Sequence, residues 1–118
     1  GFTVTPEEKE RWRKKLIEVR EMARNAPDWY ESVPSDEAVE IIFNIVIKNL
    51  ALSYEPEAIV PDPDDGVIVR YRLWNRYVTI GIDNDTDSAV IVEMGDKRDI
   101  RPYTFYQDLP DVIRTSRI

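Results

Sequence analysis

The sequence predicts an α+β domain in which two N-terminal helices pack on one face of a three- or four-stranded antiparallel meander. Apolar residues first recur at helical spacing and later alternate with polar residues, and a proline-rich segment separates the two patterns. A chain of 118 residues has the usual size of one domain. We divide it into a helical part (5–53), a Pro-rich connector (54–66), a β part (67–106) and a C-terminal turn or short helix (107–118).

The first helix has clear signals at both ends. The Thr5 hydroxyl can accept a hydrogen bond from the backbone N–H of Glu8, and Pro6 falls at the first helical position. Pro27 prevents much continuation at the other end. The predicted buried stripe is Trp12, Leu16, Val19 and Ala23.

The second helix is unusually apolar. Ser35 is its expected N-cap, and the helical pattern continues to about Leu52. Its polar residues form one narrow stripe, namely Glu40, Asn44 and Lys48. A helix of this kind must be covered on most sides. We therefore expect the sheet on one face, and either the first helix or a second copy of the chain on another, which leaves a homodimer open.

The β part starts with two alternating strands, at 67–73 and 77–82. Burying the apolar set of both strands on one face requires Val69 to oppose Ile80 and Tyr71 to oppose Val78. The turn between them must then have an even length, either Trp74-Asn75 or Trp74 to Tyr77.

The remaining β pattern predicts a strand at 89–94 and a weaker one at 99–106, where Pro102 indicates an edge position. Pairing Ile82 with Val90 leaves residues 85–87 as the turn of the second hairpin. The segment 108–114 is expected to add a final helical turn.

The absence of histidine and cysteine excludes much chemistry. Disulfides, thiolate nucleophiles, Ser-His-Asp triads and Cys-ligated metal sites cannot form. An enzyme would have to use carboxylates, lysine or tyrosine. We therefore expect no cofactor and favour a protein that is not an enzyme.

The net charge of −7 is concentrated in the middle of the chain, where residues 25–66 hold ten acids and one lysine. Such a charge opposes nucleic-acid binding and favours a basic or neutral protein partner. No run is apolar enough to span a bilayer, so we expect no membrane partner, and the absence of cysteine favours a cytoplasmic location. Because the chain begins with Gly1, a missing upstream segment or leader stays open.

Two acidic clusters are weak candidates for a metal site. The spacing of Asp83, Asp85 and Asp87 resembles a calcium loop, but Ser88 stands where that loop has glycine, and Met94 stands at its position 12. A hairpin tip explains these aspartates better.

The second cluster, Asp62, Asp64 and Asp65, lies in one turn. Adjacent carboxylates there could hold Mg²⁺ for phosphoryl chemistry, although a turn punctuated by Pro and Asp is the simpler explanation.

The candidate interaction residues are Arg70, Arg72, Tyr77, Trp74 and Trp29. The first three share the outer sheet face with Thr79, and we also expect Arg101 and Tyr103 there. Arginine interleaved with tyrosine binds carboxylates, phosphates or protein surfaces, and exposed tryptophans anchor interfaces. The alternative is cross-strand pairing of arginine with tyrosine and Glu93 on a wet face, with the tryptophans closing the rim of the core.

The order of an apolar helix, a Pro-rich segment and "DGVIVRYRLWNRYVTIGID" resembles small bacterial proteins of unknown function, over about residues 35–94. Val67 stands where those proteins commonly have a second glycine. The resemblance implies the helix-and-hairpin architecture and, for some members, a toxin–antitoxin or mobile-element context. It transfers no functional residue.

Taken together, the sequence favours a non-enzymatic binding or regulatory accessory protein that acts on an unidentified protein partner. The alternative is a metal-dependent hydrolase or nuclease that uses the aspartates of the two acidic clusters.

Overall fold

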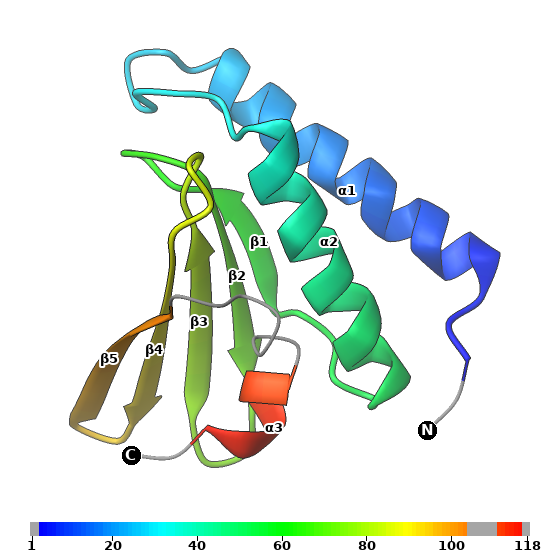
Figure 1. Ribbon diagram of the computed structural model, residues 1–118, viewed down its shortest axis with the longest axis vertical. Coiled ribbons are helices and arrows are strands. Elements are labelled where there is room, and N and C mark those ends of the chain that lie inside the picture. Colours follow the sequence, from blue (N-terminus) through cyan, green and yellow to red (C-terminus); the bar gives the residue numbers. More distant parts are fainter. Residues whose placement is uncertain (1–2, 104–110, 117–118) are drawn as a thin grey trace.

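The computed structural model describes residues 3–103 and 111–116, and it shows two long helices on one face of an antiparallel sheet (Figure 1). The sheet has five strands in the order β1-β2-β3-β4-β5. The α+β class is therefore confirmed, whereas the predicted number of three or four strands is too low. The elements are α1 (Pro6–Arg24), α2 (Asp36–Ala51), β1 (Ala58–Pro61), β2 (Val67–Arg72), β3 (Tyr77–Ile82), β4 (Ser88–Met94), β5 (Lys97–Tyr103) and α3 (Val112–Thr115).

Both long helices begin at the predicted caps. The Thr5 hydroxyl accepts a hydrogen bond from the Glu8 N–H, with the two heavy atoms 3.2 Å apart. The Ser35 hydroxyl does the same for the Ala38 N–H, also at 3.2 Å. These local bonds satisfy donors that the first helical turn leaves free, which is why the capping pattern located both starts.

The additional strand, β1, lies inside the segment that the sequence predicted to be only a Pro-rich connector. Its residues alternate between exposed and buried, and Ile59 opposes Val69 of β2. Pro61 ends the strand and opposes Val67. Because β1 is at the edge of the sheet, the missing N–H of this proline removes no necessary ladder bond.

The first predicted hairpin is confirmed in detail. Val69 opposes Ile80 and Tyr71 opposes Val78, as the burial pattern required. The Leu73 N–H donates to the Arg76 carbonyl at 2.8 Å, which leaves Trp74-Asn75 as a two-residue turn.

The register predicted for the second hairpin is wrong by two residues. Ile80, and not Ile82, opposes Val90. The Asp83 N–H donates to the Asp87 carbonyl at 2.8 Å, so the loop is 84–86, with Thr86 at a φ of +74°. A slip of two residues keeps every side chain on its own face, so burial could not distinguish the two registers and the turn geometry decided between them.

The fifth strand, β5, is an edge strand, as Pro102 indicated, but it begins at Lys97. Arg101 opposes the buried Val90, and Tyr103 pairs with Ser88. The position of Arg101 belongs to the face that carries the helices, so its predicted place on the outer face is wrong, while the side chain of Tyr103 lies outside the described part of the chain. The predicted C-terminal helical turn agrees with α3 over the residues that are described, while 104–110 lie outside them.

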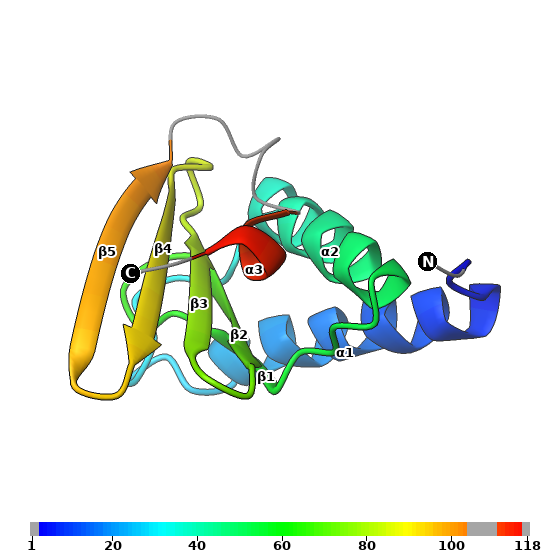
Figure 2. The ribbon, with the colours of Figure 1, turned by 90° about the horizontal axis from the view of Figure 1, so that it is seen from below.

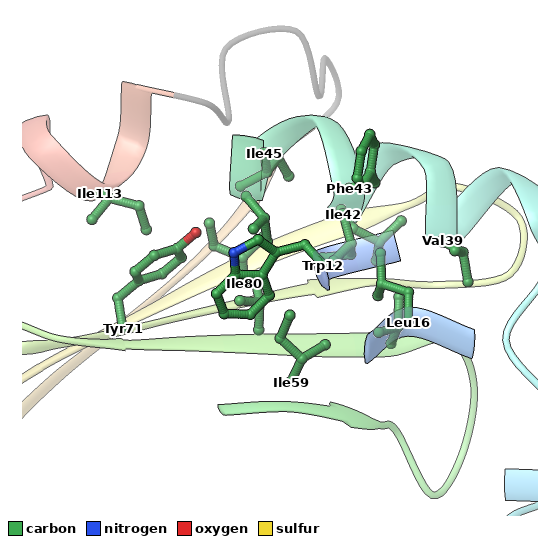
Figure 3. Close-up of a cluster of buried hydrophobic side chains, with 14 of the residues drawn as sticks. Trp12, Leu16, Val39, Ile42, Phe43, Ile45, Ile59, Tyr71, Ile80 and Ile113 are labelled. Atoms are coloured by element: carbon green, nitrogen blue, oxygen red, sulfur yellow. The ribbon is translucent and has the colours of Figure 1, made fainter. Parts of the chain in front are cut away.

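The core lies between the sheet and the helix pair (Figure 3). Trp12 and Leu16 of α1 meet Ile42 and Ile45 of α2 over the strands, and all four side chains are buried. The stripe Glu40, Asn44 and Lys48 is exposed, as predicted. Helix α2 is thus covered by α1 and the sheet within one chain, which removes the reason for expecting a second copy there.

Candidate interaction surface

The side of the sheet opposite to α1 and α2 carries no helix among the described residues (Figure 2). We call it the outer face. The register of the five strands assigns to it Ala58, Val60, Ile68, Arg70, Arg72, Tyr77, Thr79, Gly81, Ala89, Ile91, Glu93, Arg98 and Ile100.

Apolar residues form the middle of the outer face. Ile68 and Ile91 are half-buried by their neighbours in the sheet, whereas Val60 is 38% exposed and Ile100 is 58% exposed. A band of apolar side chains with a charged border is typical of a surface that another molecule covers.

A hollow of 360 Å³ lies at the end of the outer face where β2 turns into β3. Its lining consists of Arg70, Arg72, Leu73, Trp74, Asn75, Arg76, Tyr77, Glu93 and Gly95. The Arg70 guanidinium carbon is 4.1 Å from the centre of the Tyr77 ring, and that of Arg72 is 5.9 Å from it. One aromatic ring therefore orients two cations.

The turn that carries Trp74 is held from behind by Arg76. This arginine is buried, and its guanidinium donates to the Ile113 carbonyl at 2.9 Å and to the Ser116 hydroxyl at 3.2 Å. A further bond of 2.8 Å goes to the Asn75 side chain within the turn. Helix α3 and the β2–β3 turn are thereby joined, while Trp74 itself is 94% exposed.

Arg70 and Arg72, the two arginines over the Tyr77 ring, differ in their ion pairing. Arg70 Nε lies 3.5 Å from a carboxylate oxygen of Glu57 on the edge strand's N-terminal side. Arg72 is exposed and has no ion pair among the described residues. The cross-strand pairing with tyrosine that the sequence offered as an alternative is present, but the described residues contain no ion pair between an arginine and Glu93.

Four of the five predicted interaction residues, Arg70, Arg72, Trp74 and Tyr77, meet in this hollow. Trp29 does not join them, although it is 79% exposed. It lies in the connector between the helices, which is bonded to the β1–β2 turn through the Glu31 N–H and the Pro63 carbonyl at 2.8 Å. The β1–β2 and β2–β3 turns are at opposite ends of β2, so Trp29 belongs to the other end of the molecule.

Sequence reasoning missed the role of Arg76. Its position next to a two-residue turn gave no indication that its partners would be α3 carbonyls almost forty residues later. A buried arginine is recognised only when the segment that accepts its hydrogen bonds is in place.

The two acidic clusters are separate in the sequence but come together in the fold. Carboxylate oxygens of Asp65, Asp83 and Asp85 lie within 4.8 Å of one another, because the β1–β2 and β3–β4 turns are adjacent at one end of the sheet. Desolvation raises the pKa of Asp83, and the negative charges of Asp65 and Asp85, and then of Asp62 and Asp87, raise it further.

Carboxylates of the two clusters also accept hydrogen bonds from backbone N–H groups, within their own turn for Asp62 and Asp85 and across the two turns for Asp65. Oδ1 of Asp65 accepts from the Asn84 N–H at 3.3 Å, Asp62 accepts from the Asp64 N–H at 2.9 Å, and Asp85 accepts from the Asp87 N–H at 3.2 Å. The local bonds of Asp62 and Asp85 are the backbone role that aspartate commonly has in turns, whereas the bond of Asp65 joins the two turns. The aspartates line neither the hollow on the outer face nor a groove of 810 Å³ between α1 and β1.

Comparisons of the chain with family models, with curated proteins and with solved structures find no match. Among the described residues, no helix combines the length and the apolar character that crossing a membrane requires.

Proposed function

We propose that this protein is a non-enzymatic binding or regulatory accessory protein that docks a protein partner on its outer face. The observation that carries the proposal is the hollow in which Trp74, Tyr77, Arg70 and Arg72 meet, beside an apolar band that no helix of the described residues covers. Tryptophan, tyrosine and arginine are the residues in which interface binding energy is concentrated.

The support for this proposal is both chemical and mechanical. An indole that is 94% exposed gains from burial only when a partner covers it. The bonds from Arg76 to α3 hold the turn that presents this indole, so little conformational entropy is lost on binding. A cytoplasmic location belongs to the same proposal, since a chain without cysteine is suited to a reducing compartment.

A metal-dependent hydrolase is the alternative, and one observation favours it: Asp65, Asp83 and Asp85 approach within 4.8 Å. A catalytic site also needs a concave place for substrate, and the two hollows described above are lined by other residues. Binding through the outer face is therefore the better-supported function.

The two exposed tryptophans provide a matched test. Tagged wild-type protein, Trp74→Ala and Trp29→Ala are expressed in the cells that naturally contain the protein, and bound proteins are identified by quantitative mass spectrometry. We expect a partner that wild type and Trp29→Ala retain and that Trp74→Ala loses by tenfold or more, which corresponds to about 1.4 kcal/mol or more.

Equal recovery of every bound protein by the two variants would show that the outer face is not the docking surface. The alternative is tested separately by calorimetric titration with Mg²⁺, Mn²⁺ and Ca²⁺. It requires a saturable heat that Asp83→Asn abolishes, and a titration without heat removes it.

A further inference from the structure

The hydrogen bonds of the sheet determine which backbone groups of β5 point to its open edge. The Asp83 N–H donates to the Asp87 carbonyl, so the odd-numbered residues of β4 point their backbone groups to β3 and the even-numbered ones to β5. The odd-numbered residues of β5 therefore complete the ladder with β4. The even-numbered residues, Arg98, Ile100 and Pro102, point to the edge, and the sheet has no described strand beyond them.

The two edges of the sheet differ in their protection. β1 has only four residues, and α1 runs beside it along the groove of 810 Å³. β5 has seven residues, and no described helix lies along its outer edge (Figures 1 and 2). A long edge with unpaired backbone groups is a template for another strand. Pro102 removes one donor from this edge but leaves all of its carbonyls, so β5 is where a strand can be added.

We propose that β5 pairs antiparallel with β5 of a second copy of the chain, with the two Ile100 residues directly opposite each other. Each Ile100 N–H then donates to the Ile100 carbonyl of the other copy. Each Arg98 N–H donates to the Pro102 carbonyl of the other copy, so the proline takes part as an acceptor. The two-fold axis passes through this strand pair and joins the two sheets into one.

The charges of β5 are complementary to themselves in this register. Asp99 lies opposite Arg101 of the other copy, and the two-fold axis repeats this pair. Within one chain the two side chains already form an ion pair on the face that carries the helices. Pairing the strands arranges charges of alternating sign around the axis, which stabilises an antiparallel pair. A second copy supplies this match without any further requirement on sequence, because the segment Asp99-Ile100-Arg101 is its own complement.

Other symmetric registers of the same edge are less favourable. An axis at Asp99 would set two aspartates opposite each other and Lys97 opposite Arg101. An axis at Arg98 or at Arg101 would oppose two arginines, and like charges directly opposite each other destabilise a strand pair. An axis at Pro102 would oppose two residues that both lack an N–H. The proposed register avoids all of these conflicts.

The pairing also covers apolar surface on the outer face. Ile100 is 58% exposed, and its counterpart in the second copy would shield it. The axis is perpendicular to the sheet, so both outer faces lie on the same side, and the hollow at Trp74 is lined by no residue of β5. The inference is therefore independent of the docking function and leaves the docking surface accessible. One strand pair buries less area than a standard interface, so we expect a weak dimer that depends on concentration.

The first test uses the absence of cysteine, because a single introduced thiol then reports its own position. Ile100→Cys and Val60→Cys replace exposed outer-face residues on the two edge strands. Residues directly opposite in a bonded antiparallel pair have Cα atoms about 5.5 Å apart, which a disulfide can bridge. Under mild oxidation Ile100→Cys should form disulfide-linked dimer about tenfold faster than the matched control Val60→Cys.

The second test exchanges the charges across the axis. Asp99→Arg and Arg101→Asp each oppose like charges in their own dimer, so each should weaken self-association about tenfold in sedimentation velocity. When the two variants are mixed, position 99 of one copy opposes a charge of opposite sign at position 101 of the other. A heterodimer should then form with an affinity within about threefold of wild type.

The matched charge control is Glu18→Arg on α1, which alters the net charge as Asp99→Arg does and whose side chain is 68% exposed. It should change self-association by less than about twofold. Thermal unfolding and NMR spectra of each variant verify that it is folded, and the two cysteine variants decide the question if a charge variant is not.

A wild-type chain that stays monomeric at every concentration would overturn the inference. Equal cross-linking of Ile100→Cys and Val60→Cys would do the same, as would folded charge variants that remain monomeric after mixing. None of these results bears on the docking function, which the loss of a cellular partner by Trp74→Ala tests separately.

Discussion

Replacing Gly66 with alanine should destabilise the protein through two independent effects. Gly66 has a φ of +87°, a conformation that costs a residue with a side chain about 1–2 kcal/mol. An alanine Cβ at this position would also lie 2.0 Å from the Ile82 carbonyl oxygen and 2.7 Å from the Asp83 Cα. Both atoms belong to the backbone, so relief requires movement of β3 where it enters its turn.

The magnitude follows from these terms. Forcing extra volume into a packed place costs about 1–3 kcal/mol, and the loss of unfolded-state entropy on replacing glycine returns about 0.4–1 kcal/mol. The expected destabilisation is therefore roughly 2–4 kcal/mol, a large part of the about 5–15 kcal/mol typical of a domain. In urea this lowers the unfolding midpoint by about 1–2 M without a change in slope.

Two other glycines separate the contributions. Gly95 has a φ of +61°, but an alanine Cβ there would meet nothing within 4 Å, so Gly95→Ala should cost only about 0.5–1 kcal/mol. Gly81 has neither a positive φ nor a close neighbour, and Gly81→Ala should be neutral or slightly stabilising. The reasoning is refuted if Gly66→Ala costs no more than Gly95→Ala in the same urea titrations.

Three further substitutions test other parts of the structure. The Tyr71 hydroxyl is buried without a hydrogen-bond partner among the described residues, and burial raises the pKa of this phenol. Tyr71→Phe should therefore raise the free energy of unfolding by about 0.5–2 kcal/mol, and a lower melting temperature of the variant would disprove this gain. The variant should also lose less stability than wild type above about pH 10, where the tyrosine ionises only in the unfolded chain. The pKa of Asp83 is also raised on folding, so the folded state is more stable with the Asp83 carboxyl protonated than with it ionised. This stabilisation is lost as the pH rises through the folded-state pKa. Asp83→Asn should consequently be more stable than wild type at about pH 7 and equal to it in stability near pH 3. If the free energies of unfolding of variant and wild type differ by the same amount at both pH values, the electrostatic explanation is contradicted. Arg76→Met should cost about 2–3 kcal/mol and accelerate amide exchange in α3, whereas unchanged exchange there would show that the arginine does not hold this helix.

The proposed docking surface and the acidic turns occupy opposite ends of the same strands. Trp74 follows the end of β2, and Asp65 comes shortly before its beginning. A substitution at one end should therefore have little direct effect on the other end, so the partner-binding and metal-binding hypotheses can be tested separately.

Features that depend on neighbours in the chain were predictable from local pattern. Thr5 and Ser35 specified where the helices begin, because a cap requires only the next turn of backbone. The alternation in β2 and β3 specified which side chains are buried, and the short turn at Trp74 then allowed one register. The candidate residues Arg70, Arg72, Trp74 and Tyr77 were accessible to this reasoning because they belong to one hairpin.

Features that depend on distant contacts were settled by the folded chain alone. Ile59 and Pro61 form a strand because β2 is available to pair with them, although the local sequence has the composition of a turn. The second hairpin adopts its register through the turn around Thr86, since a slip of two residues left burial unchanged. The approach of Asp65 to Asp83 and the attachment of α3 by Arg76 likewise join segments whose proximity is created by sheet pairing and core packing, which no local pattern encodes.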